Sequence, residues 1–340
     1  MSSEQRRALR IALTFTCSFL AAELLRIDLQ LTFLAPLVAS SLACGPKVPG
    51  RVALVLPLIA WTLVMLAGLA LQFLIDKPVV LALLLLWVFW GGFTIMRNPR
   101  LATLGLIVLL VFAIVPQTLI KAPELDADLA WWFGLDFALA AAADFVFRGL
   151  LPEPPPPRRS VRPPVLSPLG AAAALLLAVV LTAAMQLPAP GAIIVGIVIV
   201  LRSDVESAYG VILDRFIAAF MGGAVALAIW EIIWVAPDLP VLATSLLLAA
   251  WLFSRRIAEG GPQADLATKS LNVLAILIGE GFSVFFEDAD DRFGTRLAGV
   301  MIGLAYVTLI VVLLRRPNRR LQRLGHPEPP SGDPLGSPLS

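Results

Sequence analysis

Residues 152–168 read PEPPPPRRSVRPPVLSP and divide the chain into two strongly apolar halves. This segment, called the linker below, holds eight prolines and three arginines in seventeen residues. Because proline fixes φ and removes a backbone donor, the linker cannot cross hydrocarbon as a helix. We therefore expect a solvated, polyproline-like connector between two membrane-embedded parts.

The composition on either side of the linker is that of an integral membrane protein. Hydrophobic residues make up 59% of the chain and charged residues 15%, against roughly 45–50% and about 25% in soluble domains. The mean hydropathy is +0.88. A chain this apolar has too little polar surface for water, so we expect a lipid bilayer around it and no nucleic acid partner. Cys17 and Cys44 both lie in apolar runs, which predicts free thiols and no disulfide.

The apolar runs between charged clusters predict twelve membrane-spanning helices, since one span needs about 20 apolar residues. The first run is followed by more apolar sequence and has no evident peptidase site, so it reads as an uncleaved span. The segments are 8–25, 31–44, 52–75, 78–96, 101–120, 130–149, 169–186, 189–201, 211–235, 239–254, 270–286 and 293–314.

The distribution of basic residues predicts that both termini are cytoplasmic. Lys and Arg collect in the cytoplasmic loops of membrane proteins. With the N-terminus inside, 21 of the basic residues fall in inside segments and 5 in outside segments. The predicted outside loops are acidic, with Glu124, Asp126 and Asp128 in one of them.

The two halves resemble each other, which predicts an internal repeat. Six spans return the chain to the same side, so the repeats would be parallel and related by an axis along the membrane normal. The predicted domains are 1–151, the linker at 152–168, the second half at 169–316 and a disordered cytoplasmic tail at 317–340. Four short matches occur in order at offsets of 160 to 165: Arg51 with Arg215, Asp76 with Asp238, 101–103 with 266–268, and 133–136 with 293–296.

Two pairs of irregular segments predict where a transport site lies. Residues 31–44 and 189–201 are too short to span, at roughly 20 Å of helix where about 30 Å is needed. Pro116-Gln117 and Gly279-Glu280-Gly281 are expected to interrupt the fifth and eleventh segments. Short or broken segments at corresponding places in two halves point to a transport pathway. The alternative is a kinked helix packed inside the bundle.

Glu280 is the first candidate for a proton-carrying group. It falls near mid-membrane, where an ionised carboxylate is costly, so we expect it to be protonated or paired. A carboxyl that alternately exchanges its proton with the two sides suits a proton-coupled carrier. A purely structural role is the alternative.

Asp136 and Arg296 form the second candidate site. They stand at equivalent positions of the sixth and twelfth segments and carry opposite charge, so they could pair across the repeat axis. Alternatively, each reaches interfacial water. Arg215 opens the ninth segment and either anchors the helix end or attracts anions, and Gln117 is expected on the pathway. Asp144, near a helix end, is expected at the interface.

Missing motifs argue against an enzyme. The sequence contains no GxxxxGK[ST] motif, its one histidine is His326 in the tail, and neither cysteine has an evident ligand partner. We therefore expect no metal site and no cofactor.

The layout of two six-helix halves, with Arg51 before Gly68 and Arg215 before Gly222-Gly223, resembles the fusaric-acid-resistance-like (FUSC) superfamily, in a compact bacterial branch. The resemblance implies efflux of aromatic or other amphipathic carboxylic acids from the bacterial inner membrane, with a periplasmic membrane-fusion adaptor as partner. A homo-oligomer is also expected. The exporters of that superfamily carry a sizeable soluble cytoplasmic domain, whereas this chain has only the linker and a short tail.

Three functional hypotheses follow. The first is a proton-coupled secondary carrier that exports organic anions, which suits a basic inner surface, acidic outer loops and Glu280. The second is an anion channel without proton coupling. The third is a non-transporting membrane scaffold that assembles a periplasmic adaptor.

Overall fold

The computed structural model describes residues 2–25, 34–45, 50–98, 101–121, 126–152, 167–185, 193–194, 197–198, 201, 208–282, 301–302, 305–306 and 309. Throughout this part the regular structure is helical, with no strand. Ten helices have defined bounds: α1 Ser3–Leu24, α2 Leu34–Cys44, α3 Gly50–Leu74, α4 Pro78–Met96, α5 Ala102–Lys121, α6 Asp126–Leu150, α7 Pro168–Ala184, α9 Ala208–Val235, α10 Leu239–Glu259 and α11 Pro262–Phe282.

By length and composition, five of these helices could cross a membrane. They are α3, α4, α6, α9 and α10. The described part is all-helical, and the chain is a multi-pass membrane protein. Large apolar side chains stand exposed on the outside of these helices, among them Phe73, Trp87, Phe220 and Trp234. A surface of this kind suits hydrocarbon and would be unfavourable in water.

Local signals in the sequence set several of the helix ends. Ser2 and Ser167 cap α1 and α7, each accepting a hydrogen bond from the backbone N–H three residues on, as helix N-caps do. Gly260 and Gly261 have φ values of 79° and 75° and form the turn between α10 and α11. Because this turn is so short, α11 begins at Pro262, eight residues before the predicted start at 270.

The prediction that the helices of the fifth and eleventh segments are broken is wrong. The helix α5 continues through Pro116 to Lys121, and α11 continues through Gly279 and Gly281 to Phe282. A proline inside a helix removes one backbone donor, and packing of the helix against its neighbours outweighs that loss in α5. All side chains from Leu109 to Gln117 of α5 are buried.

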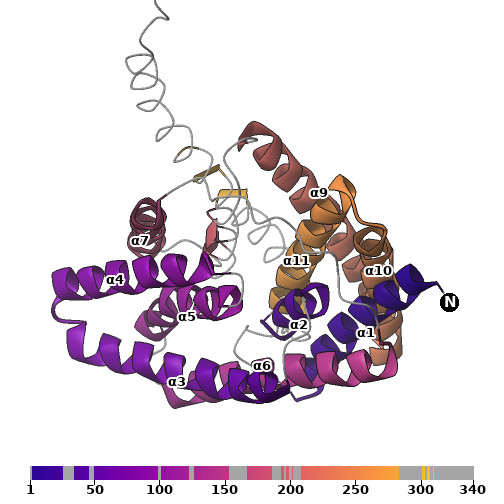
Figure 1. Ribbon diagram of the computed structural model, residues 1–340, viewed down its shortest axis with the longest axis horizontal. Helices are drawn as coiled ribbons and strands as arrows, with labels where there is room; N and C mark the ends of the chain where they lie inside the picture. The colour runs from indigo at the N-terminus through magenta and orange to yellow at the C-terminus, as the bar shows by residue number, and fades with distance from the viewer. Residues whose placement is uncertain are drawn as a thin grey trace, which may run out of the picture.

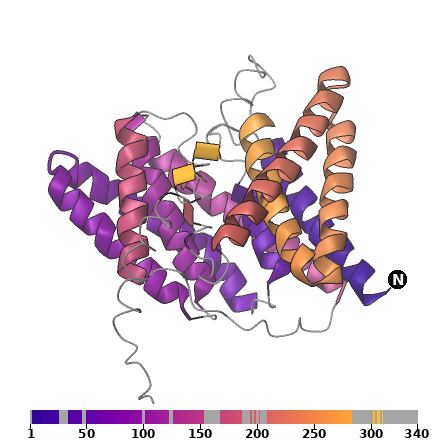
Figure 2. The ribbon, with the colours of Figure 1, turned by 90° about the horizontal axis from the view of Figure 1, so that it is seen from above.

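The described helices form two groups, which we call the first and second bundles (Figures 1 and 2). In the first bundle, α1 packs against α10, α2 and α6, while α11 packs against α9, α10 and α2. In the second bundle, α4 packs against α5 and α7, and α5 also packs against α3. The pair α3 and α6 joins the two bundles. Each bundle thus contains helices from before and after the linker.

Glycines allow two of the helix pairs to approach closely. A Cβ on Gly105 of α5 would lie 2.7 Å from the backbone oxygen of Gly92 in α4. A Cβ on Gly222 of α9 would lie 2.6 Å from the backbone oxygen of Ser270 in α11. Real Cβ atoms do not approach backbone this closely, so only glycine fits at these contacts. Small residues at helix contacts are typical of membrane bundles.

Candidate functional site

The short helix α2 is among the most buried elements of the described part. Nine of its eleven residues are buried, and its length is about 16 Å, which confirms the prediction of a short second segment. The described residues of the predicted eighth segment, at 193–194, 197–198 and 201, are helical and also fully enclosed. The described residues of both segments therefore lie against protein, where irregular backbone is tolerated in a membrane protein.

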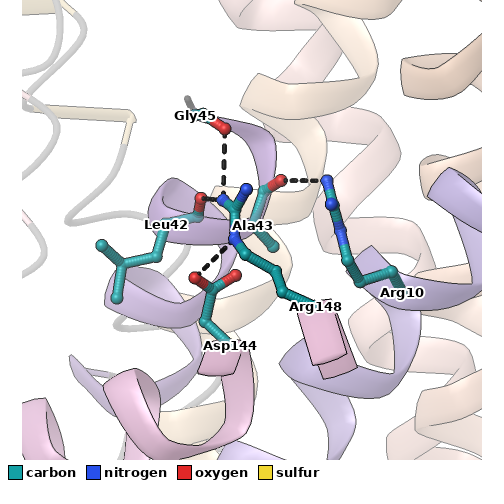
Figure 3. Close-up of polar contacts among 6 residues, drawn as sticks. All are labelled: Arg10, Leu42, Ala43, Gly45, Asp144 and Arg148. Carbon is teal, nitrogen blue, oxygen red and sulfur yellow. Dashed lines mark hydrogen bonds and ion pairs between the residues drawn. The ribbon is translucent and has the colours of Figure 1, made fainter. Parts of the chain in front are cut away.

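Two arginines from other helices hold the C-terminal end of α2 (Figure 3). Arg10 of α1 donates from Nη2 to the carbonyl of Ala43 at 3.0 Å. Arg148 of α6 donates from Nη2 to the carbonyl of Leu42 and, at 3.2 Å, to that of Gly45. The last carbonyls of a helix have no partner within it and carry partial negative charge. The two guanidinium groups supply both the missing donors and the opposite charge.

Asp144 completes this anchor. Its Oδ2 accepts a hydrogen bond from Arg148 Nε at 2.7 Å, and both side chains are nearly enclosed. The interfacial depth expected for Asp144 stays a prediction, and the structure adds that its carboxylate is enclosed by protein. Arg148 draws the carboxylate inward, because a buried charge needs a paired partner. The signal in the sequence was the spacing of Asp144 and Arg148, since i and i+4 share one face of a helix.

A polar bridge joins α2 to α11. Ser40 Oγ lies 3.0 Å from Asn272 Oδ1 and donates a hydrogen bond to it. Ser40 is buried and Asn272 partly buried. The two residues are 232 positions apart in sequence, so the short helix is fixed to the second half of the chain as well as to the first. Asn272 was not recognised as a candidate from the sequence, because a lone Asn in an apolar helix carries no partner information.

Gln117, a predicted pathway residue, makes a second bridge between the halves. Its Nε2 donates to Thr182 Oγ1 at 2.7 Å and to the carbonyl of Val179 at 3.1 Å, both on α7. Thr182 in turn lies within hydrogen-bond distance of the carbonyl of Ala178. Gln117 is 4% exposed, and its bonds fix α5 to α7. The structure thus gives Gln117 a packing role that the sequence did not indicate.

Asp136, the predicted partner of Arg296, is fully enclosed in α6, with 0% of its surface exposed. Neither carboxyl oxygen has a hydrogen-bond partner among the described residues. It stands within the span Asp128–Leu150. This is the largest unsatisfied polar group inside the described part of a membrane-spanning helix, and it differs in kind from the paired Asp144 on the same helix.

The other three predicted site residues have no described side chain. Glu280 lies on α11 and Arg215 on α9, but their side chains fall outside the described part. Arg296 lies outside the described residues altogether, so its pairing with Asp136 stays a prediction. The two predicted residues that are described, Gln117 and Asp136, lie in different bundles: α5 belongs to the second and α6 to the first.

Within the described ranges no group of three or more His, Cys, Asp or Glu side chains could hold a metal ion. Cys17 and Cys44 form no disulfide within the described residues.

No family model matches this chain, and no match was found among the curated proteins or among the solved structures.

Proposed function

We propose that this protein is a proton-coupled exporter of aromatic or amphipathic carboxylic acids in the bacterial inner membrane. The observation that carries the proposal is Asp136, a carboxyl group that is fully buried in a membrane-spanning helix without a hydrogen-bond partner among the described residues. Burying an ionised carboxylate without a partner costs about several kcal/mol of desolvation free energy. Such a group is kept only where it has a use.

Asp136 has two ways to avoid a bare buried charge, and a carrier can use both. It can take up a proton, or it can pair with a cation such as the predicted Arg296. Alternation between the two states lets the same site release a proton on one side and accept one on the other. Glu280 would act with it as the second proton-exchanging group, since it lies on α11 of the same bundle.

The twelve-span topology with two parallel six-helix repeats is part of the proposal, and matched helix packing supports it. A repeat that relates α1 to α7, α3 to α9, α4 to α10 and α5 to α11 predicts that helix contacts recur in pairs, and three such pairs are present. The pair α1 and α10 is matched by α7 and α4; α4 and α5 by α10 and α11; and α3 and α5 by α9 and α11. Tyr306, in the predicted twelfth segment, donates a hydrogen bond to the carbonyl of Ala174 in α7. The corresponding contact in the first half is that of α6 with α1.

The capping serines give independent support for the repeat. Ser2 and Ser167 both cap the first helix of their half. Their numbers differ by 165, which is within the offsets of 160 to 165 among the four sequence matches.

The anchor at the end of α2 supports the proposed topology, because it brings three helix ends that are expected on the same side into contact. The beginning of α1, the end of α2 and the end of α6 are all expected at the cytoplasmic face. Arg10, the last carbonyls of α2 and Arg148 come from those three places, and hydrogen bonds join them. Basic residues on this side would attract organic anions before export.

Membership of the FUSC superfamily, a periplasmic membrane-fusion adaptor and a homo-oligomeric state belong to the same proposal. They rest on the arrangement of segments in the sequence. Arg215, seven residues after the start of α9 at Ala208, would then serve to attract the anion.

The test is export of a hydroxybenzoate from preloaded proteoliposomes, with the outer pH below the luminal pH. The intact protein should give efflux above protein-free liposomes that collapses when the pH gradient is dissipated. Asp136→Asn and Glu280→Gln should each lower gradient-driven efflux at least ten-fold while exchange of substrate at equal pH continues. The matched control is Asp76→Asn, because Asp76 is an exposed carboxylate between α3 and α4.

The two alternatives give different results in the same assay. Efflux that follows an imposed voltage and ignores the pH gradient would identify an anion channel. No flux above protein-free liposomes, together with recovery of a periplasmic adaptor in a pull-down, would identify a scaffold. Unchanged gradient-driven export by both Asp136→Asn and Glu280→Gln would exclude proton coupling through these groups.

A further inference from the structure

The interface of α1, α2 and α6 places polar side chains between Asp136 and one end of the first bundle. Arg10 of α1 donates to the carbonyl of Ala43 at the end of α2 (Figure 3). Ala22 of α1 packs beside Ala35 at the beginning of α2. The helices α1 and α2 are therefore antiparallel, and the side of α1 that meets α2 extends from Arg10 to Ala22.

Asp136 lies on the face of α6 that meets these two helices. Trp132 and Leu139, four residues before it and three residues after it, both pack against the alanine pair of α1 and α2. Residues at this spacing share one face of a helix, so Asp136 faces α1 and α2 near the beginning of α2. Further along α6, Arg148 binds the last carbonyls of α2, so α6 runs in the same direction as α2.

Two hydroxyl groups of α1 lie between these two levels. Thr14 and Ser18 continue the four-residue spacing that begins at Arg10 and ends at Ala22, and residues four apart lie on the same side of a helix. Each step of four residues is about 6 Å along the helix axis. Thr14 is 0% exposed and Ser18 is 1% exposed. From Asp136 toward the anchored end of α2, the hydroxyls of Ser18 and Thr14 therefore follow one another inside the protein.

Thr14 differs from most buried hydroxyl groups of the described part. Four of these groups donate a hydrogen bond to a carbonyl of their own helix: Ser18, Ser40, Thr182 and Ser270. Three have no hydrogen-bond partner among the described residues: Thr14, Thr16 and Ser254. Buried polar groups without a protein partner commonly bind an ordered water molecule. We therefore expect the Thr14 hydroxyl to bind water at this interface.

Few charged side chains approach Asp136 from the neighbouring helices. Besides α1, the helices with extensive contacts to α6 are α2 and α3, and their described side chains include no Asp, Glu, Lys, Arg or His. Glu23 is the single charged residue of α1 beyond Arg10. At the anchored end, Asp144 Oδ2 pairs with Arg148. Asp144 Oδ1 has no partner among the described residues and can accept a hydrogen bond from water there.

We infer that Asp136 exchanges its proton with the expected cytoplasmic face through Ser18 and Thr14, along the interface of α1, α2 and α6. The inference rests on the proposed function, which requires a proton route on that side. The O–H bond of the Asp136 carboxyl breaks, each hydroxyl or water on the route gives up one proton as it takes up another, and cytoplasmic water receives the last. Hydroxyl oxygens both accept and donate hydrogen bonds, as this relay needs. Ionisable groups inside membrane helices commonly belong to such relays.

Replacement of the Thr14 hydroxyl tests the inference in the proteoliposome assay. Thr14→Val keeps the shape of the side chain and should lower gradient-driven hydroxybenzoate efflux at least ten-fold, while substrate exchange at equal pH changes less than two-fold. Thr14→Ser keeps the hydroxyl and should retain efflux within two-fold. The matched control is Thr16→Val, since Thr16 is also buried without a described partner but lies about 200° around α1 from Thr14.

Two results of this assay would overturn the inference. One is equal gradient-driven efflux in the Thr14→Val and Thr16→Val variants. The other is a parallel fall of gradient-driven efflux and equal-pH exchange in Thr14→Val, which would assign Thr14 to structure or to passage of the substrate.

Hydrogen–deuterium exchange at Asp136 separates this inference from the proposed function, because it needs no transported substrate. The infrared C=O band that disappears in Asp136→Asn identifies the protonated carboxyl, and its shift after transfer to D₂O gives the exchange rate. We expect Thr14→Val to slow this exchange at least ten-fold and Thr16→Val to change it less than two-fold. Slowed exchange without hydroxybenzoate efflux would support the proton route and contradict the proposed substrate. Equal exchange rates in the two variants would overturn the route even if hydroxybenzoate is exported, and absence of the band at every pH would contradict both proposals.

Discussion

Two carboxylates on α6, Asp144 and Asp136, are both buried in apolar surroundings but differ in their partners. Asp144 accepts a hydrogen bond from Arg148, which itself binds the last carbonyls of α2. Asp136 has no hydrogen-bond partner among the described residues. A buried charge with a partner fixes neighbouring helices, whereas a buried carboxyl without one adds no cohesion and is free to change its protonation. Burial alone thus does not distinguish a structural carboxylate from a candidate proton-exchanging one, but the hydrogen-bond partners do.

The largest expected effect comes from breaking the anchor. Arg148→Ala leaves Asp144 buried without a counter-charge and removes a donor from the end of α2. We expect a loss of about 3–5 kcal/mol in the free energy of unfolding, as for one partner of a buried ion pair. Thermal unfolding in detergent measures it. Arg148→Lys should recover part of the loss, because the ammonium keeps the charge but not the planar fork of donors.

A loss below about 1 kcal/mol in Arg148→Ala would place this ion pair among the weakly stabilising, solvent-screened pairs, and the distinction between Asp144 and Asp136 would disappear.

An intermediate effect is expected for the neutral bridge between α5 and α7. Gln117→Leu removes two hydrogen bonds and leaves Thr182 Oγ1 without its Gln117 donor. We expect destabilisation of about 1–3 kcal/mol, the cost of leaving buried polar groups unsatisfied. Thr182→Val and the double variant complete a cycle with a coupling energy of about 0.5–1.5 kcal/mol. Additive effects in the two single variants would show that the side chains do not interact.

The smallest effect on stability is expected at Asp136 itself. Asp136→Asn keeps the shape and removes a charge that has no described partner, so the free energy of unfolding should change by less than about 1 kcal/mol or rise. The same thermal unfolding assay checks this value. Asp144→Asn, the matched change on the same helix, should be clearly more destabilising because Arg148 loses its counter-ion. Equal losses in the two variants would mean that Asp136 also has an ionic partner, for which Arg296 is the predicted candidate.

Much of the local structure follows from short signals in the sequence. The predicted span 78–96 coincides with α4, because Pro78 is a favourable first residue and Arg97 ends the apolar run. The shortness of the second segment was also evident from charge spacing alone. The start of α11 was missed, because the polar residues from Gln263 to Lys269 concealed the continuation of the helix to the Gly260-Gly261 turn.

The sequence recovered less of the candidate site. It identified Asp136 and Gln117 from their polar chemistry in apolar helices, and the structure describes both as buried. It missed Arg10, Arg148 and Asn272, since each acts on a helix distant in the chain. Arg10 and Arg148 appeared only as charges in the count of cytoplasmic residues, where nothing distinguishes an exposed arginine from one that caps a buried helix.

The sequence by itself determined that this is a helical membrane protein and where most of its helices begin and end, because apolar length, proline, glycine and charge act within a few residues. Only the tertiary structure decided which helices pack together, and it combined helices from both halves in each bundle. The physical reason is that lipid and helix surfaces are equally apolar, so hydrophobicity selects no partner in a membrane. Close approach at small residues and pairing of buried polar groups make that choice, and both depend on contacts between distant parts of the chain.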